Sequence, residues 1–274
     1  MYFSKQILTL FILFLIISNI SCITTAPGNT PLHQREIENK YKVPVWFIQK
    51  PQISGVNLVY AYAPQYLNKA TEKKKLLYSA AESIAKYKKV RLNILQEGRL
   101  QTGKYLSNTQ ELESDVTINE ETLEEKYSII CQYPIGSGII ALAAETAQLK
   151  TANLRIINKL KKLKIDSPPK WVVNPPFEKG FVYAVGSAQD HSSPEKAWKV
   201  AEKNARANLA LQISSTMQFK NNDIQTSMWE WLVTHHQISS SMVLKNVSII
   251  KHGYHEPSRT YYALARMPTK HIHK

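Results

Sequence analysis

Residues 171–213 read WVVNPPFEKGFVYAVGSAQDHSSPEKAWKVAEKNARANLALQI, and this stretch decides the expected fold of the chain. Its centre, Phe181 to Ala188, passes from aromatic and β-branched residues to small ones, which is typical of a largely buried strand. A helix is expected to follow, because Ser193 is a favourable N-cap and Pro194 suits the first helical position. Residues 171–213 therefore predict one strand and one long helix.

One face of the predicted helix carries small or apolar side chains at every fourth position. These residues are Ala197, Ala201, Ala205, Leu209 and Ile213. Such a face lets a helix lie close against a sheet, while Lys196, Lys199, Glu202, Lys203 and Arg206 take the other faces. Gly186 is the only glycine near the strand-to-helix turn, so the turn carries neither a dinucleotide-binding nor a phosphate-binding motif.

Three separated blocks carry a resemblance to a known family: PKWVVNPP (residues 169–176), YAVGSA (183–188) and NARANLALQI (204–213). In this order they resemble the bacterial lipoprotein-20 (LPP20-like) family over most of residues 168–268. The resemblance implies an α+β domain, a place in the cell envelope and no established enzymatic activity. It also implies a more distant likeness to the N-terminal domain of the flagellar assembly protein T.

The first 22 residues have the composition of a secretory signal. Lys5 is their only charged residue, and the apolar run from Ile7 to Ile17 is much shorter than the about 20 residues that a spanning helix needs. Cys22 follows a small residue and resembles the acylated cysteine of a bacterial lipobox. Asn19 stands where that pattern prefers leucine, so an uncleaved short anchor and cleavage without lipidation remain alternatives. In each case the body of the chain is expected to be exported.

The sequence after Val43 repeats the order of residues 171–213. VPVWFIQKP is followed by LVYAYAP and then by TEKKKLLYSAAESIAKY. Trp46 matches Trp171 and Pro51 matches Pro176, both at an offset of 125 (171 − 46). We therefore predict two tandem copies of one domain, with chance similarity between two α+β segments as the alternative.

The two copies are expected to differ in detail. Tyr60 is matched with Tyr183 at an offset of 123 (183 − 60), which implies two extra loop residues in the first copy. Tyr127–Pro134 is matched with Tyr261–Pro268 as the closing strand. The first copy is degenerate, since it lacks the NARANLA block.

The predicted fold class is α+β, with two similar domains that each pack a long helix on a small antiparallel sheet. Leucines near helical spacing within Ile139–Ile165 predict a helix that connects the two domains and ends before Pro168. The expected organisation is a signal peptide (1–22), a flexible tether (23–42), a first repeat (43–135), a connecting helix (136–167) and a second repeat (168–270).

The second copy is expected to continue with a second helix or covering segment over residues 224–238. Met242–Tyr254 and Thr260–Met267 then predict an antiparallel pair of strands, with the turn at His255–Ser258. In the first copy, the acidic run within Leu112–Lys126 lacks apolar flanks and is interpreted as a solvated face.

No combination of residue types points clearly to catalysis. The histidines lack the spacing of a metal site, so we expect no metal and no cofactor. Cys131 lies in a strand-like run and is interpreted as a small buried hydrophobe. If the chain is nevertheless a periplasmic hydrolase, the candidates are Asp190, His191 and Ser192 at the strand-to-helix turn.

The net charge of +14 favours anionic partners. Export makes nucleic acid an unsuitable partner, and the lysines form no aromatic-interleaved stripe. The leading hypothesis is a non-enzymatic lipoprotein of the bacterial envelope, anchored to a membrane through acylated Cys22 and facing the periplasm or the surface. It would bind or scaffold envelope proteins or anionic polymers. A periplasmic hydrolase and a secretion or flagellar accessory protein are the alternatives.

Overall fold

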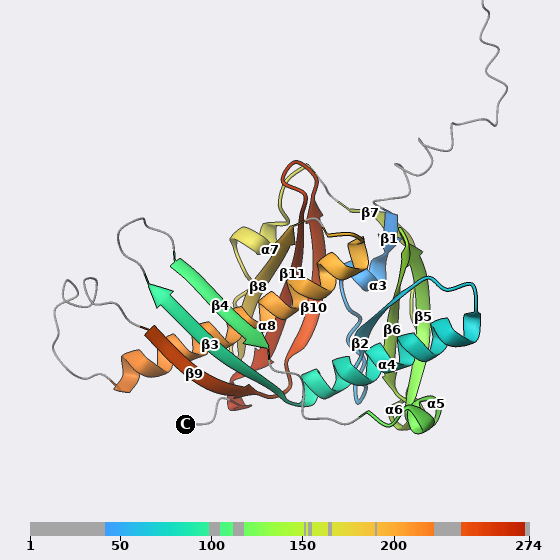
Figure 1. The fold of residues 1–274 in the computed structure, drawn as a ribbon, viewed down its shortest axis with the longest axis horizontal. Helices are drawn as coiled ribbons and strands as arrows, with labels where there is room; N and C mark the ends of the chain where they lie inside the picture. Colours follow the sequence, from blue (N-terminus) through green and yellow to red (C-terminus); the bar gives the residue numbers. More distant parts are fainter. Residues whose placement is uncertain are drawn as a thin grey trace, which may run out of the picture. The chain divides into compact units, whose positions relative to one another are not determined.

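The computed structural model describes residues 42–98, 105–111, 118–150, 152, 155–163, 166–189, 191–221 and 237–271. All of them belong to one compact unit (Figure 1). The predictions for the signal peptide, for the tether up to residue 41 and for residues 224–236 lie outside the described part. Lys42, which we expected in the tether, begins the short strand β1 (Lys42–Pro44).

Sheet I belongs to the first copy and has the strand order β2-β6-β5. Its strands are β2 (Val59–Pro64), β5 (Tyr127–Ile135) and β6 (Gly138–Glu145), all antiparallel. Helix α4 (Lys69–Lys88) begins after Asn68, whose side chain accepts hydrogen bonds from the N–H groups of Ala70 and Thr71. Leu76, Ala80 and Ile84 of α4 pack on one face of this sheet.

Sheet II belongs to the second copy and has the strand order β10-β11-β8. Its strands are β8 (Phe181–Gln189), β10 (Ser248–His255) and β11 (Thr260–Pro268). Helix α8 (Pro194–Asn221) begins at the predicted residue, where the carbonyl of Ser193 accepts the N–H of Ala197. The Ser193 hydroxyl donates to the carboxylate of Glu195.

Gly186 lets α8 lie very close to sheet II. A Cβ atom at this position would stand 2.1 Å from the carbonyl oxygen of Ala201 and 2.1 Å from the nitrogen of Ala205. The predicted small face of the helix, including Ala197, Ala201, Ala205 and Leu209, is completely buried. The expected strand and closely packed helix are therefore confirmed.

A third sheet joins the two copies. Strand β3 (Val90–Gly98) follows α4, and it pairs on one side with β4 (Tyr105–Glu111) and on the other with β9 (Gln237–Leu244) of the second copy. Strand β1 pairs with β7 (Leu160–Lys162). The remaining elements are short: α3 (Val45–Ile48), η2 (Glu120–Thr122), α5 (Leu123–Lys126), α6 (Thr146–Leu149), α7 (Lys170–Val173) and η3 (Thr269–His271).

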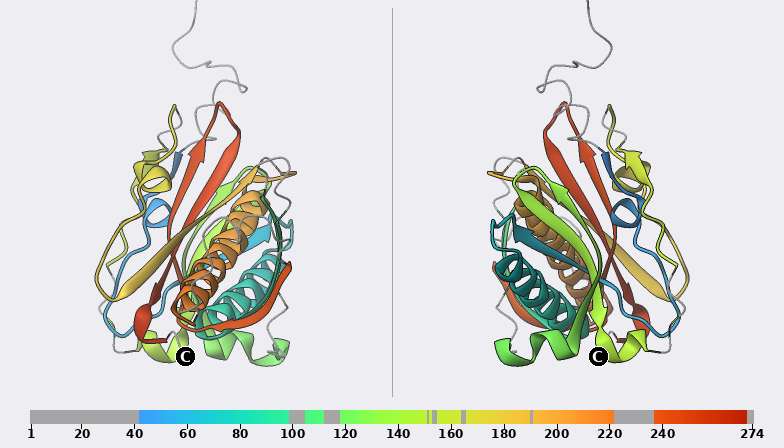
Figure 2. Two further views of the ribbon diagram at one scale, coloured as in Figure 1. Left: turned by 90° about the vertical axis from the view of Figure 1, so that its left-hand side faces the viewer. Right: turned by 90° about the vertical axis from the view of Figure 1, so that its right-hand side faces the viewer.

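Helix α8 lies between sheet II and the first copy (Figure 2). Its small face packs on sheet II, and α8 also contacts β2 and β6 of sheet I. One large apolar cluster contains residues of α8, of sheet II and of the sheet I face that points away from α4. The core is thus shared by both copies, and their boundaries as separate domains, 43–135 and 168–270, stay a prediction.

The two copies share a common order of elements, to which the first copy adds β4, η2 and α5 before its closing hairpin. Each has a short helix, a strand, a long helix, a further strand and a closing hairpin, and sheets I and II have matching strand orders. Each hairpin also carries an irregularity at the same place, between Ile129 and Cys131 in β5 and between Ile249 and Lys251 in β10. This agreement supports the predicted duplication.

The shared irregularity corrects two details of the predicted alignment. In sheet I, Ala143 of β6 pairs with Ile129 on one side and with Val59 on the other. In sheet II, Ala265 of β11 pairs in the same way with Ile249 and with Ala184. Val59 and Ala184 are offset by 125 (184 − 59), as are the N-cap positions Asn68 and Ser193. The offset of 123 and the two extra loop residues were therefore wrong.

The matching of the closing strands was also wrong. β5, which contains Tyr127–Pro134, is an edge strand and corresponds to β10. β11, which contains Tyr261–Pro268, is central and corresponds to β6. Tyr127–Pro134 and Tyr261–Pro268 both end in proline, but they occupy different positions in their sheets.

The predicted connecting helix over residues 136–167 is wrong. Residues 138–145 form β6, the central strand of sheet I, and Gly138–Ala144 are all buried. A strand that is buried on both faces has a continuous apolar run without alternation. Periodicity alone does not distinguish such a run from part of a buried helix. The single strand expected over Met242–Tyr254 is likewise broken, because Asn246 turns the chain with a φ of 58° between β9 and β10.

The hairpin turn at His255–Ser258 is confirmed, since β10 ends at His255 and β11 begins at Thr260. The described acidic residues of the run within Leu112–Lys126 lie at the surface as expected. Glu120 pairs with Lys74 at 2.6 Å and Glu124 pairs with Lys73 at 3.0 Å, which ties the segment to α4. The α+β fold class is confirmed.

Candidate functional site

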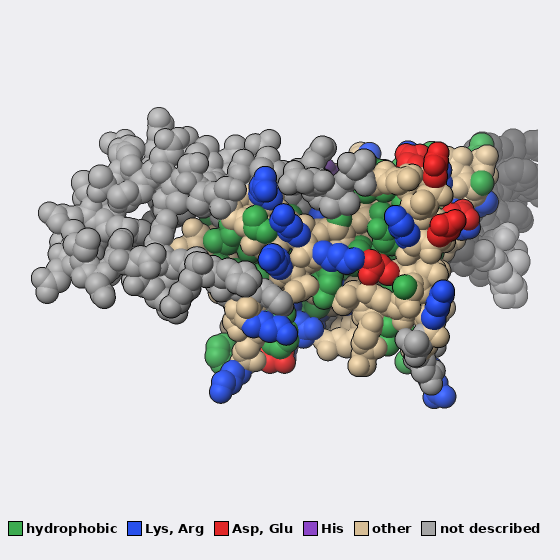
Figure 3. Space-filling model, turned by 90° about the horizontal axis from the view of Figure 1, so that it is seen from below, with side chains coloured by type: hydrophobic (Ala, Val, Ile, Leu, Met, Phe, Trp, Pro, Cys, Tyr) green, Lys and Arg blue, Asp and Glu red, His purple; other side chains and the backbone are tan. Residues whose placement is uncertain are grey.

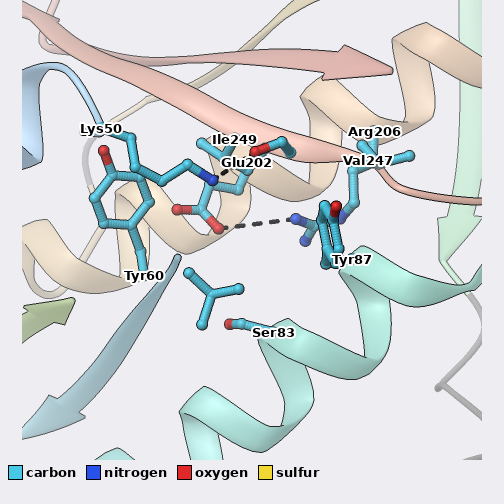
Figure 4. A pocket seen from close by; sticks show the side chains of 10 residues that line it. Lys50, Tyr60, Ser83, Tyr87, Glu202, Arg206, Val247 and Ile249 are labelled. Atoms are coloured by element: carbon cyan, nitrogen blue, oxygen red, sulfur yellow. Dashed lines mark hydrogen bonds and ion pairs between the residues drawn. The ribbon is translucent and has the colours of Figure 1, made fainter. Parts of the chain in front are cut away.

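A cluster of polar side chains, buried except for the half-buried Lys50, lies where the two copies meet, and we call it the inter-copy cluster. Figure 4 shows Lys50, Tyr60, Glu202 and Arg206 of this cluster. The first copy contributes Lys50, Tyr60 and Tyr62, and the second contributes Glu202, Arg206 and His252. Buried charged groups are costly unless they are paired and hydrogen-bonded. A cluster of this kind therefore calls for an explanation.

Local structure places each member of the cluster. Tyr60 and Tyr62 alternate with Ala61 along β2, so Ala61 faces α4 while both tyrosines face the second copy. Glu202 and Arg206 lie one helical turn apart on α8, and both are less than 8 % exposed. Lys50 follows α3, whose residues Trp46 and Phe47 are buried in the shared core.

Glu202 and His252 form the centre of the cluster. Nε2 of His252 lies 2.9 Å from Oε1 of Glu202, and Nδ1 lies 3.0 Å from the carbonyl oxygen of Phe47. The hydroxyl of Tyr62 donates to the same Glu202 oxygen at 2.5 Å. Arg206 Nη1 lies 3.8 Å from the second Glu202 oxygen. Glu202 thus receives partners from both copies.

These contacts require one more proton than a neutral histidine and a carboxylate provide. Both ring nitrogens of His252 face acceptor oxygens, whereas a neutral imidazole has a single N–H. The pair therefore exists as imidazolium and carboxylate, or as imidazole and carboxylic acid. Burial raises the pKa of Glu202, but the hydrogen bond and charge of His252, with Arg206 and Tyr62, outweigh burial and hold that pKa below its usual value. This direction favours the carboxylate form of Glu202.

Aromatic rings enclose His252. The Phe47 ring stacks on the imidazole at a centroid distance of 4.2 Å and an interplanar angle of 8°. Tyr60 and Trp198 meet it edge-on at 4.5 and 6.2 Å. His252 is 1 % exposed, so its side chain is out of reach of a substrate in solution.

Lys50 lies at the edge of the cluster. Its Nζ donates to the carbonyl oxygen of Leu58 at 2.8 Å and to Oγ of Ser248 at 2.5 Å. Burial lowers the pKa of Lys50 from 10.5 to about 7, against the opposing attraction of Glu202. The adjoining cavity of about 20 Å³ is lined by Lys50, Glu202 and Arg206 among others, and it has room for about one water molecule (Figure 4).

Two of the three residues proposed for a hydrolase, His191 and Ser192, belong to the described structure. Asp190 lies outside the described residues, whereas His191 and Ser192 are exposed. The Ser192 hydroxyl accepts a hydrogen bond from Lys196 at 3.3 Å. Neither residue lines the cavity beside the inter-copy cluster or two larger ones, of about 210 and 550 Å³, in the described part of the chain.

Other predicted site residues have ordinary surroundings. Burial raises the pKa of the Cys131 thiol to about 11, which opposes formation of the nucleophilic thiolate. Cys22 lies outside the described residues. Within the described ranges, no three His, Cys, Asp or Glu residues are grouped so that they could hold a metal ion. No helix of this same part of the chain is long and apolar enough to cross a membrane.

Sequence reasoning missed the inter-copy cluster. The sequence places Glu202 and Arg206 on faces of α8 other than the one that packs on sheet II, and the structure agrees. These side chains are nevertheless buried, because α8 also packs against the first copy. The available signal was the alternation in LVYAYAP, where Tyr60 and Tyr62 share one face of a strand. Buried tyrosine hydroxyls need polar partners, and the partners come from the other copy.

Comparison with known proteins gives one match. Residues 169–267 match the family model described as LPP20 lipoprotein, and these residues run from the start of α7 to the end of β11. The match confirms the predicted resemblance of this part of the chain to a family of envelope lipoproteins. No curated protein and no solved structure matches the chain. The likeness to the flagellar assembly protein T stays a prediction.

Proposed function

We propose that the chain is a lipid-anchored envelope protein that binds or scaffolds other envelope components without catalysis. The match of residues 169–267 to the family model described as LPP20 lipoprotein supports this proposal. In this proposal Cys22 is the acylated first residue of the mature chain. The residues that follow Cys22 tether the two-copy body to the membrane.

The observation that supports binding over catalysis is the enclosure of the inter-copy cluster. Glu202 and His252 have acid and base chemistry, but both are buried and bonded to each other. The cavity beside them accommodates a water molecule and no larger substrate. The pair is suited to holding the two copies together, which leaves partner binding to the outer surfaces.

The surface charge supports an anionic partner. The chain has a net charge of +14, and Figure 3 shows Lys and Arg side chains spread over one face of the described body. Such a surface attracts acidic envelope polymers and the acidic faces of proteins. A nucleic-acid partner is not part of the proposal.

Detergent-phase partitioning tests the anchor. The full chain should enter the detergent phase, and the Cys22→Ser variant should enter the aqueous phase after signal cleavage. Crosslinking in intact cells, followed by identification of the captured components, then tests the scaffolding role. A Cys22→Ser variant that stays in the detergent phase at full length would contradict lipidation.

A separate assay tests the proposal that the chain is not an enzyme. Purified chain and a His191→Ala/Ser192→Ala double variant are compared on ester, amide and glycoside substrates. We expect no turnover above background with either protein. Turnover that the double variant loses would establish the hydrolase alternative instead.

A further inference from the structure

An open cleft of about 210 Å³ adjoins the inter-copy cluster, and Lys50 lines both. The segment after α3 in the first copy forms one wall of this cleft, and strands of sheet II form the other. Six lining residues matter for its chemistry: Lys50, Ile53, Val56, Phe181, Ile250 and Arg266. Four of these are apolar and two are basic.

The ammonium group of Lys50 has an N–H donor that is available to a ligand in the cleft. An ammonium group has three N–H donors, and two of them bond to the Leu58 carbonyl and the Ser248 hydroxyl. Both of these acceptors are neutral. Within the described residues, Lys50 has no carboxylate at ion-pair distance and one N–H is left for a ligand.

Arg266 supplies the second positive charge. Its guanidinium lies over the Phe181 ring at 4.5 Å from the centroid, and its side chain is 20 % exposed. The ion pair with Glu178 is long, at 3.9 Å between Nη1 and Oε2. A guanidinium has five N–H donors and binds carboxylates in a planar fork. The group can therefore bind a second carboxylate in the cleft.

We infer that this cleft binds a small molecule that carries one carboxylate next to an apolar group, with Lys50 and Arg266 on the carboxylate. The inference names a ligand class for the proposed binding role and rests on that role. It does not depend on the acyl chain, so a failure of lipidation and a failure of ligand binding are separate results.

Size and charge both favour a small carboxylate. The cleft is smaller than the about 300 Å³ at which pockets for drug-sized ligands begin. The positively charged donors in the cleft are one N–H of Lys50 and the guanidinium of Arg266, which also pairs with Glu178. A phosphate dianion needs more hydrogen-bond donors than these, whereas a carboxylate monoanion needs fewer. The apolar side chains of Ile53, Val56 and Ile250 then suit a hydrocarbon or aromatic substituent.

Binding should depend on pH because Lys50 titrates. Burial lowers the pKa of Lys50 to about 7, so the ammonium loses its proton between pH 6 and pH 8. Several other ionisable groups face Lys50 or line the cavities beside it: Tyr60, Tyr87, Glu202, Arg206 and Arg266. Burial raises the pKa of both tyrosines, so neither loses its proton in this range. Affinity should therefore fall as the pH rises through 7.

Calorimetric titration of the full-length protein in detergent with phenylacetate tests the inference. We expect binding at pH 6 and an affinity about tenfold lower at pH 8, since the charged fraction of a group with a pKa of about 7 falls about tenfold. Phenylacetamide, which has the same shape without the charge, should bind at least tenfold more weakly at pH 6.

Three variants complete the experiment. Lys50→Met and Arg266→Gln should each weaken phenylacetate binding at least tenfold at pH 6, while the exposed control Lys150→Met should leave it unchanged. Near-ultraviolet circular dichroism shows whether Lys50→Met is folded. If it is not, the Arg266→Gln variant still tests the inference. Equal binding of phenylacetate and phenylacetamide, or unchanged binding by Arg266→Gln, would overturn the inference.

Discussion

Oε1 of Glu202 on helix α8 and Nε2 of His252 on strand β10 lie 2.9 Å apart inside the shared core. The second copy supplies both residues, but the first copy completes their hydrogen bonds. Tyr62 donates to Glu202, and the Phe47 carbonyl accepts from His252. A structural pair within one copy is therefore satisfied only when the other copy is in place.

Glu202→Gln should destabilise the protein strongly. The substitution keeps the size of the side chain but removes the charge that His252 and Arg206 face, and breaking a buried pair costs about 3–5 kcal/mol. Urea unfolding at pH 7 measures the loss. Glu82→Gln is the matched control, because Glu82 pairs with Lys199 at the surface at 3.3 Å and should cost less than about 1 kcal/mol. Equal losses in both variants would contradict this role of Glu202.

The free energy of unfolding should also depend on pH in the acidic range, because of Glu202. The folded protein holds the pKa of Glu202 below its usual value, so the unfolded chain takes up a proton first as the pH falls. The stabilisation is present above the unfolded pKa of about 4.3 and is lost as the pH falls through the folded pKa. Unfolding free energies measured from pH 3 to pH 6 should show a steeper decrease for the wild type than for Glu202→Gln.

Lys50 should make stability depend on pH in the alkaline range as well. Its pKa is about 7 in the folded protein and 10.5 in the reference state, so the unfolded chain binds more protons between these values. Stability should therefore rise with pH from about 7 to 10.5, by at most about 5 kcal/mol at 1.36 kcal/mol per pKa unit. In Lys50→Met this contribution should disappear, and the variant should be more stable than the wild type at pH 6. Parallel pH profiles for the two proteins would show that Lys50 is charged in the fold.

Gly186→Ala should separate α8 from sheet II. The added methyl group would lie 2.1 Å from backbone atoms of the helix, and such overpacking costs about 1–3 kcal/mol. Thermal unfolding measures the loss, with Ser187→Ala as the control, because Ser187 is exposed on the same strand. A Gly186→Ala variant as stable as Ser187→Ala would mean that the helix lies farther from the sheet.

Asn204 and Asn208 should protect the edge of sheet II. Their side-chain amides donate to the carbonyl oxygens of Ser187 and Val185 on the edge strand β8, each at 2.7 Å. Free carbonyls on an edge strand invite pairing with another chain. An Asn204→Ala/Asn208→Ala variant should self-associate in sedimentation velocity, while Lys203→Ala should stay like the wild type. If the double variant sediments like the wild type, these asparagines do not protect the edge strand.

Local sequence signals predicted the elements whose ends are chemically marked. Ser193 and Pro194 placed the start of α8 correctly, and the small side chains from Ala197 to Leu209 predicted its contact with a sheet. In the sequence alone, the NARAN block (residues 204–208) supports only the family resemblance. The structure gives its physical role, since Ala205 packs on Gly186 while the flanking asparagines cap the edge strand.

The errors arose where tertiary burial overrides local pattern. Strand β6 is buried on both faces by α4 and the second copy, so its apolar run carries no two-residue period and was interpreted as part of a helix. The sequence places Glu202 on a face of the helix other than the packing face. Its burial depends on the first copy, which is more than a hundred residues away along the chain. A motif within one copy gives no signal for a contact of this kind.

The most direct test of the proposed function is mass spectrometry of the N-terminal peptide from protein extracted from the cell envelope. The proposal predicts that the mature chain begins at Cys22 and that this residue carries a diacylglyceryl group on sulfur. Protein extracted from the cytosol with residues 1–22 intact and an unmodified Cys22 would contradict it.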